Sequence, residues 1–121
     1  MQASGEDRQD WRQQWQLADM PFYWVQLPNY RKAADTPTES PWATLRAAQN
    51  AALALPHTGQ AVTIDVGDAN DVHPHDKQTV AHRLALMALR NDYGQTEVYC
   101  DSPQPVEAHT DAEGNVMVSF D

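Results

Sequence analysis

Ionisable side chains are concentrated in residues 65–77, which read DVGDANDVHPHDK and contain four Asp, two His and one Lys. A histidine titrates near neutral pH, so it can take a proton from a hydroxyl nucleophile when a carboxylate holds its other ring nitrogen. His73 is the candidate base, and Asp71 and Asp68 are both near enough in sequence to supply that carboxylate. One chemistry that this segment supports is therefore proton transfer.

The same segment holds oxygen and nitrogen ligands of the kind that bind metals, namely Asp68, Asp71, His73 and His75. Their spacing does not match an HExxH helix or a CxxC pair. It also fails the D-x-[DN]-x-[DN]-G calcium pattern, because Gly67 precedes Asp68 instead of following the acidic residues. We therefore predict no metal ligands in this segment.

A third interpretation is structural, because Asp and Asn cap turns and helices, and acidic groups favour helix N-termini. We prefer it for His75 and Asp76, which fall where the first turn of a helix is expected. For His73 it stays open beside proton transfer.

The segment lies between a predicted strand and a predicted helix. Residues 61–66 (AVTIDV) are apolar and β-branched without alternation, which is typical of a strand covered on both faces. A helix is predicted from Pro74 to Gly94, with Gly94 as the residue that ends it. Ligands and catalytic groups collect at the carboxyl ends of strands in open α/β sheets, so we expect His73 to face a crevice there.

The N-terminal part predicts a helix and a strand. Residues 6–17 suit a helix in which Trp11 and Trp15, four residues apart, fall on one face and dock it. Residues 22–27 (FYWVQL) are aromatic and β-branched between two prolines, which predicts a short buried strand.

A longer helix is predicted in the middle of the chain, with Ser40 as its N-cap, Pro41 at its first position and Pro56 as its stop. Helix and strand therefore alternate, which favours a parallel α/β architecture. Beyond Gly94, residues 96–100 (TEVYC) are predicted as a strand, 101–111 as a loop and 113–121 as a turn and final strand. We thus divide the chain into an α/β part, residues 1–95, and a β-rich extension, residues 96–121.

Composition excludes several classes of function. The chain has 121 residues, a formal net charge of -9 and only eight Lys and Arg, which argues against nucleic acid as a partner. No apolar stretch is long enough for a membrane span and the N-terminus is too polar for a signal peptide, so no membrane partner is expected. A single Cys, Cys100, cannot form an internal disulfide, and the compartment is left undetermined.

Several blocks of the chain resemble, in order and spacing, the sialate O-acetylesterases, carbohydrate esterases of the SGNH-hydrolase superfamily. The blocks are DWRQQW, PFYWVQLPNY and the long run from Trp42 to Gly94. The resemblance covers about residues 10 to 95 and corresponds to the C-terminal half of the catalytic domain of that family. It implies a flavodoxin-like three-layer α/β/α fold and removal of acetyl groups from hydroxyls of sialic acids or related sugars. The family does this with a serine nucleophile and a histidine base, without metal or other cofactor.

The resemblance carries over to particular residues. His73 in DVHP matches the catalytic histidine, and Asp71, or as the alternative Asp68, would orient it. The superfamily usually has Asp three residues before this histidine, where the present chain has Asn70. Gln26 in WVQL matches a recurrent glutamine of the family, with a substrate-facing role or a packing role.

The family's nucleophile, in a G-x-S motif, and its oxyanion-hole Gly and Asn have no match here. None of the serines lies in such a context: Ser4, Ser40, Ser102 and Ser119. Without a nucleophile and oxyanion donors a histidine cannot run acyl transfer. We therefore expect a fragment of a sialate O-acetylesterase-like enzyme that is inactive alone.

Apolar strands without the rest of their sheet should leave an open edge. We expect this edge to associate with the missing N-terminal half or with a second copy of the chain. The alternative function is a small non-catalytic binding or interaction domain that keeps only the crevice or the exposed edge.

Overall fold

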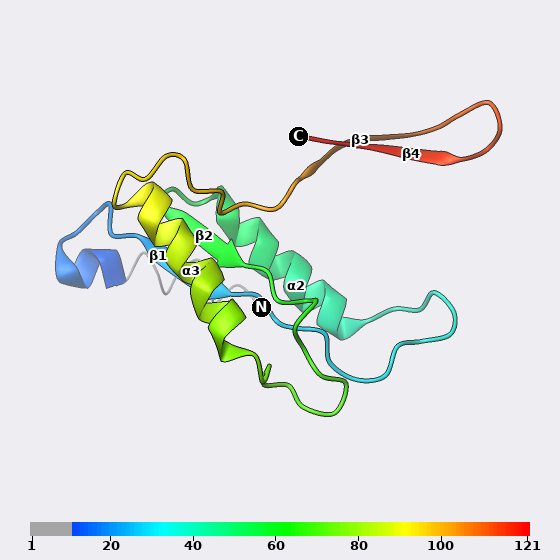
Figure 1. Ribbon diagram of the computed structural model, residues 1–121, viewed down its shortest axis with the longest axis horizontal. Coiled ribbons are helices and arrows are strands. Elements are labelled where there is room, and N and C mark those ends of the chain that lie inside the picture. Colours follow the sequence, from blue (N-terminus) through cyan, green and yellow to red (C-terminus); the bar gives the residue numbers. More distant parts are fainter. Residues whose placement is uncertain (1–10) are drawn as a thin grey trace.

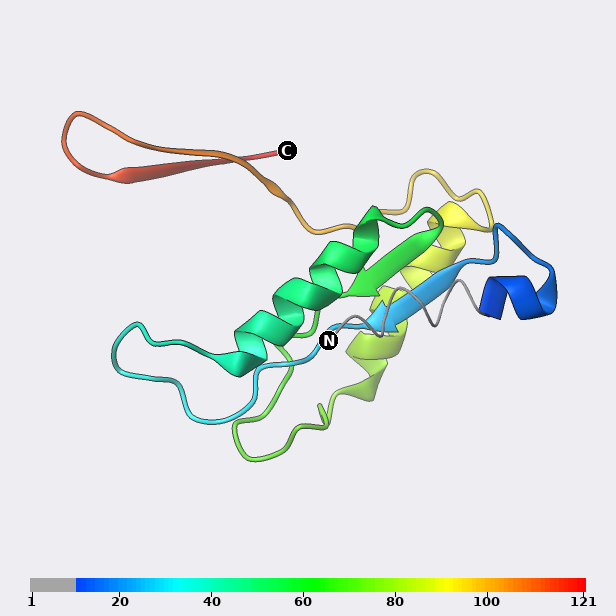
Figure 2. The same cartoon turned by 180° about the vertical axis from the view of Figure 1, so that it is seen from behind.

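The computed structural model describes residues 11–121, which form a small α/β body followed by a projecting β-hairpin (Figure 1). Two parallel strands form the sheet of the body, and a helix lies on each of its faces, as comparison of Figures 1 and 2 shows. The predicted α/β class is confirmed at this level. The elements in chain order are β1 (Phe22–Val25), α2 (Pro41–Ala51), the 3-10 turn η1 (Ala52–Ala54), β2 (Thr58–Ala61), α3 (Lys77–Asn91), β3 (Pro105–Thr110) and β4 (Val116–Phe120).

The sheet face toward α3 is shaped by a glycine. Tyr23 pairs with Gly59 across the two strands, and the Tyr23 hydroxyl donates to the Asp92 carboxylate at the end of α3, at 2.9 Å. A Cβ on Gly59 would lie 2.7 Å from the Met87 sulfur and 2.8 Å from the Tyr23 ring. The absence of a side chain at Gly59 therefore lets Met87, which is 1% exposed, pack directly on the sheet.

The other sheet face is joined to α2 by polar side chains. The Trp24 indole N–H donates to Gln60, at 2.9 Å, and the Gln60 amide donates to Asn50 of α2, at 2.7 Å. In α2, Gln49 accepts from the Leu27 backbone N–H, at 2.9 Å, and donates to the Val25 carbonyl, at 3.4 Å. The Gln49 side-chain amide thus forms hydrogen bonds with the backbone of the residues before and after Gln26.

The predicted N-terminal cap of α2 is confirmed. Ser40 accepts from the backbone N–H of Ala43, and Pro41 opens α2. The predicted end of α3 at Gly94 is displaced: α3 ends at Asn91 with Asp92 as its C-cap, and Gly94, with a φ of +70°, lies two residues beyond that cap. The predicted start of α3 at Pro74 is wrong, because Asp76 accepts from the Thr79 N–H and makes Lys77 the first helical residue.

The first helix is not docked by its tryptophans. Residues 11–15 are helical, but Trp11 and Trp15 are 51% and 61% exposed; residues 6–10 of the predicted helix lie outside the described residues. The buried side chain is Arg12, which donates to the carbonyls of Met20 and Pro56 at 2.9 and 2.8 Å. The prediction for the tryptophans is wrong, because the hydrogen bonds from Arg12 to these carbonyls, and not apolar contacts of the tryptophan rings, hold residues 11–15 in place.

The predicted strand at residues 61–66 is displaced, since β2 is Thr58–Ala61. Its ladder partner β1 ends at Val25, and the last ladder bond runs from the Gln26 N–H to the Ala61 carbonyl. Beyond this point side chains replace the ladder: the Thr63 hydroxyl donates to the Gln26 carbonyl, at 2.7 Å. The predicted strand at 22–27 is shortened to β1, because the Gln26 carbonyl and the Leu27 N–H bond to the side chains of Thr63 and Gln49.

The C-terminal residues form a separate antiparallel sheet of β3 and β4. The predicted final strand is confirmed by β4. The predicted strand at residues 96–100 is wrong, because the carbonyls of Thr96 and Val98 accept from the Arg90 guanidinium instead of from a strand. The predicted loop at 101–111 is wrong over β3, which pairs with β4 despite its proline.

Little apolar surface is buried. Among residues 11–121, the buried apolar side chains are those of Ala61 and Met87 and of two prolines, Pro28 and Pro74. The whole chain exposes 9218 Å², whereas a compact monomer of 13.6 kDa exposes about 6,600 Å². In the part of the chain that the structure describes, no helix has both the length and the apolar character needed to cross a membrane.

The fold predicts that Gly59→Ala destabilises the protein by about 1–3 kcal/mol, since the added methyl group overpacks the contact with Met87 and Tyr23. Urea unfolding followed by circular dichroism measures this. In Gly59→Ala/Met87→Ala the space released by Met87 should make the double substitution cost less than the sum of the single ones. A Gly59→Ala protein as stable as the unmodified one would contradict the described packing.

Candidate active site

The candidate site lies where the chain leaves the carboxyl ends of β1 and β2. The two exits are joined by the bond from the Arg31 N–H to the Ala69 carbonyl, at 3.0 Å. Gly67 packs so closely on Asn29 that a Cβ would lie 2.2 Å from the Asn29 side-chain oxygen. This glycine therefore allows the loop from β2 to lie directly against the segment that follows β1.

Arg83 of α3 holds the start of the loop. Its guanidinium donates to the Val62 carbonyl, at 2.6 Å, and to both carboxylate oxygens of Asp65, at 2.7 and 2.6 Å. These bonds from Arg83 lower the pKa of Asp65 from 3.8 to about 2. The start of the loop that carries the histidines is thus anchored to α3.

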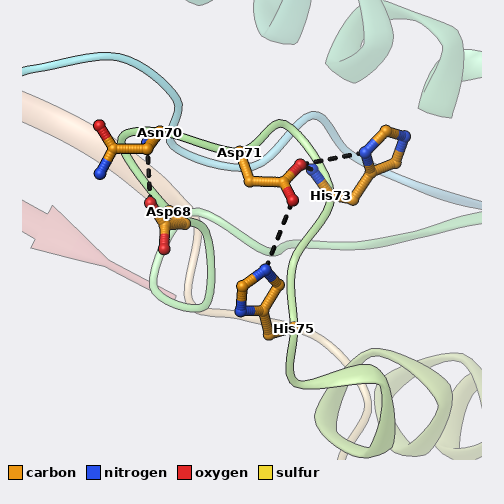
Figure 3. A network of polar contacts seen from close by, with 5 residues as sticks. All are labelled: Asp68, Asn70, Asp71, His73 and His75. Atoms are coloured by element: carbon orange, nitrogen blue, oxygen red, sulfur yellow. Dashed lines mark hydrogen bonds and ion pairs between the residues drawn. The ribbon is translucent and has the colours of Figure 1, made fainter.

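Asp71 and His73 form a direct pair (Figure 3). The Asp71 Oδ1 lies 3.0 Å from His73 Nδ1 and accepts from the His73 backbone N–H, at 2.8 Å. The backbone bond, followed by the contact with the ring, lowers the pKa of Asp71. The carboxylate therefore favours the tautomer with the proton on Nδ1, which leaves the Nε2 lone pair free to accept a proton.

His75 also contacts Asp71, and this contact was missed by the sequence prediction. Its Nε2 lies 3.4 Å from the second oxygen of Asp71, and Figure 3 shows the carboxylate between the two rings. His75 was predicted in the first turn of α3, but it precedes that helix. Asp76, also predicted there, is instead the N-cap itself. The four-residue spacing of Asp71 and His75 was the available signal, but it applies only within a helix.

Asp68 has a different role from Asp71. Its Oδ1 accepts from the Asn70 backbone N–H, at 2.7 Å, which closes a local turn, and Figure 3 shows it away from the rings. Of the two carboxylates considered for His73, Asp71 alone contacts it among the interactions within residues 11–121.

Gln26 is 8% exposed and lies directly after β1. Its backbone N–H donates to Ala61 and its carbonyl accepts from Thr63. Within residues 11–121, no hydrogen bond reaches its side-chain amide. A buried amide without a partner is costly, which makes this side chain a candidate for contact with a ligand or another polypeptide.

In the part of the chain that the structure describes, no group of three or more His, Cys, Asp or Glu side chains is placed to hold a metal ion. The His73 side chain is 80% exposed. No hydrogen bond joins it to the described serines, of which Ser40 caps α2 and Ser119 lies in β4. The arrangement can accept a proton from a hydroxyl that comes from outside these residues.

The Asp65–Arg83 pair predicts an acid-sensitive contribution to stability. The pKa of Asp65 is lower in the folded protein, so the pair stabilises the fold above pH 3.8 and this is lost as the pH falls through about 2. Asp65→Asn should cost about 0.5–1 kcal/mol at neutral pH, since both side chains are partly exposed and screened. It should also flatten the stability profile between these pH values in urea titrations. Asp68→Asn, in the same loop, should retain the slope, and an unchanged slope in Asp65→Asn would contradict the prediction.

The Asp71–His73 pair predicts a biased tautomer. In the unmodified chain, neutral His73 should carry its proton on Nδ1, and Asp71→Ala should shift the population toward Nε2–H because the acceptor is lost. Nitrogen-15 NMR of the imidazole distinguishes the two forms. Asp68→Ala is the control within the loop and should leave the His73 ring spectrum unchanged; equal tautomer ratios with and without Asp71 would contradict an orienting role.

Comparison with known proteins finds no protein-family model that matches the chain. Sialate O-acetylesterase of Mus musculus is 32% identical over 114 residues, a match that covers 80% of this chain and 21% of that protein. The Homo sapiens sialate O-acetylesterase is 40% identical over 55 residues, covering 42% of this chain and 10% of that protein. The chain therefore spans only a minor part of these relatives.

A solved structure agrees with the sequence relatives. The crystal structure of a carbohydrate acetylesterase from Xanthomonas citri superposes with a TM-score of 0.80 at 43% identity, covering 93% of this chain and 26% of that chain. Sequence and structure thus indicate the same relationship over most of the chain, as a partial catalytic domain would show. The chain belongs to the sialate O-acetylesterase family.

Proposed function

We propose that this chain supplies the histidine part of a serine-dependent carbohydrate acetylesterase active site. The observation that carries the proposal is the Asp71–His73 pair, which lies in the loop beyond the carboxyl end of β2 with one ring nitrogen on the carboxylate. The substrate class is an O-acetylated sugar, sialic acid or a related one. Support for this class comes from the names of the relatives, which are acetylesterases of sialate and carbohydrate.

His73 acts as a base and then as an acid. Its Nε2 accepts the proton of a serine hydroxyl as the serine oxygen bonds to the acetyl carbon, and returns it to the sugar oxygen as the ester bond breaks. Water then repeats the sequence on the acetyl-serine, releasing acetate and regenerating the hydroxyl. Asp71 keeps the proton on Nδ1 and stabilises the imidazolium both when the serine is acetylated and when water removes the acetyl group.

The nucleophile and oxyanion donors come from polypeptide outside these 121 residues. No serine of the chain lies in a G-x-S context, and Ser40 is committed to the cap of α2. The covalent step and the stabilisation of the oxyanion are both needed for acyl transfer, so the chain alone is inactive.

The complete fold is proposed to be the flavodoxin-like three-layer α/β/α arrangement. This proposal is supported by the position of helices α2 and α3 on opposite faces of the parallel β1–β2 pair (Figures 1 and 2). Helix, sheet and helix form three layers in this small body. The missing N-terminal half would extend the sheet and cover the exposed apolar side chains of the body, among them Ile64 and Val25.

Gln26 belongs to the same proposal as a substrate-facing group. Its backbone groups are held by Ala61 and Thr63, while its buried side-chain amide has no partner within residues 11–121. A positioned amide can donate to the substrate without reorganisation. The non-catalytic binding domain considered from the sequence is not favoured, since the relatives named above are esterases.

The chain alone should not hydrolyse p-nitrophenyl acetate. When it is co-expressed with the rest of the Xanthomonas acetylesterase, the part outside the match, the complex should hydrolyse p-nitrophenyl acetate and O-acetylated sialic acid. His73→Gln should then lower kcat by about 10²–10⁴-fold, because the general base is lost. His82→Gln, in α3, is the matched control and should retain activity. His73-dependent hydrolysis by the chain alone, or full activity of the His73→Gln complex, would refute the proposal.

A further inference from the structure

The C-terminal hairpin has one apolar face and one polar face. Residues directly opposite each other on paired strands share a face, and alternate residues along a strand change face. The register pairs Val116 with Thr110 and Val118 with Ala108, and places Phe120 opposite Pro105. These residues, of which only Thr110 is polar, form the apolar face of the hairpin; the register is irregular between Pro105 and Glu107, which leaves Val106 outside the pairing. The opposite face carries Glu107, His109, Met117 and Ser119.

The apolar face of the hairpin is uncovered. All residues of β3 and β4 are exposed, and Val116, Phe120 and Val118 are 70%, 59% and 45% exposed. Figures 1 and 2 both show the hairpin projecting from the body, with its turn at the far end. A strand pair with alternating apolar and polar residues is typical of a sheet whose apolar face packs on something else.

The hairpin needs a partner for stability. An isolated two-stranded hairpin is marginally stable at best in water, and a third strand or a packed face is what stabilises it.

A second copy of the chain is a poor occupant. The hairpin and its turn carry only acidic charges besides His109, from Glu107, Asp111, Glu113 and Asp121, and the whole chain has a net charge of -9. Two copies of the chain would each carry this net charge, and the repulsion between them opposes association. A partner with basic groups around an apolar surface fits better.

The Xanthomonas acetylesterase contains more polypeptide than the part that matches this chain. The match covers 93% of the present chain, and the residues outside it are fewer than those of β3 and β4 together. At least part of the hairpin therefore has a counterpart in the superposed structure. That counterpart belongs to a chain of which the match is only 26%, so further polypeptide is available there to cover it.

We propose that the apolar face of the hairpin, centred on Val118 and Phe120, is the docking surface for the polypeptide that supplies the serine nucleophile. This rests on the proposed function, because that function requires such a polypeptide. The hairpin, distant from the histidine loop in the fold, would then act as a clamp that holds the two parts of the active site together.

The test compares two neighbouring residues of β4. Val118 and Met117 are 45% and 48% exposed and lie on the apolar and polar faces, so Val118→Ser and Met117→Ser are matched substitutions. The unmodified chain, or either variant, is co-expressed with the tagged remainder of the Xanthomonas acetylesterase. Competition with labelled unmodified chain gives relative dissociation constants. Circular dichroism of each free variant checks that the body is folded.

Docking through the apolar face predicts at least about tenfold weaker binding for Val118→Ser and less than threefold for Met117→Ser. Equal binding of both variants overturns the docking surface, while hydrolysis by the complex would still support the proposed function. Binding that depends on Val118 but yields no hydrolysis supports the docking surface and refutes the function. Failure of the unmodified chain to bind overturns the docking proposal. A homodimer in light scattering that Val118→Ser abolishes also overturns it, because a second copy is then the occupant.

Discussion

The hydroxyl of Thr63 joins the exit of β2 to the exit of β1, and the candidate site depends on this bond. Thr63 is fully buried and donates to the Gln26 carbonyl at 2.7 Å, directly after the last ladder bond between the strands. In a dry setting such a bond cannot be exchanged for water without a desolvation cost. It therefore keeps the carboxyl ends of the strands in register and sets the direction of the chain toward Arg83 and the histidine loop. This direction of the chain brings the loop with Asp71 and His73 to the edge of the sheet.

The features that could be predicted from the sequence are those with local causes. Ser40 and Pro41 mark the start of α2 because their own backbone and side-chain chemistry determines the cap. The closeness of Asp71 to His73 is local too, since a two-residue separation lets one carboxylate reach both the backbone N–H and the ring. The choice between Asp71 and Asp68 required the structure, because the turn at Asn70 decides where each carboxylate points.

The features that could not be predicted have distant causes. The strand after Pro56 ends at Ala61 because its partner β1 ends at Val25, and nothing in AVTIDV encodes the length of another strand. The first helical turn is held by Arg12 on carbonyls more than forty residues away, and apolar spacing indicated Trp11 and Trp15 instead. Strand β3 was not predicted because it begins with Pro105, whose low strand propensity is overridden by pairing with β4.

Assembly and chemistry are coupled through exposure. In the free chain the imidazole of His73 is 80% exposed, so water screens its interaction with Asp71, and an exposed pair of this kind contributes little. In the proposed assembly, a polypeptide that covers the histidine loop at the edge of the sheet would exclude water there and lower the local dielectric. The same 3.0 Å contact would then hold the ring more firmly and stabilise the imidazolium more strongly. In the proposed assembly, a partner that binds the folded state would stabilise a chain with few buried apolar side chains and strengthen the Asp71–His73 pair in one step, because both equilibria shift together.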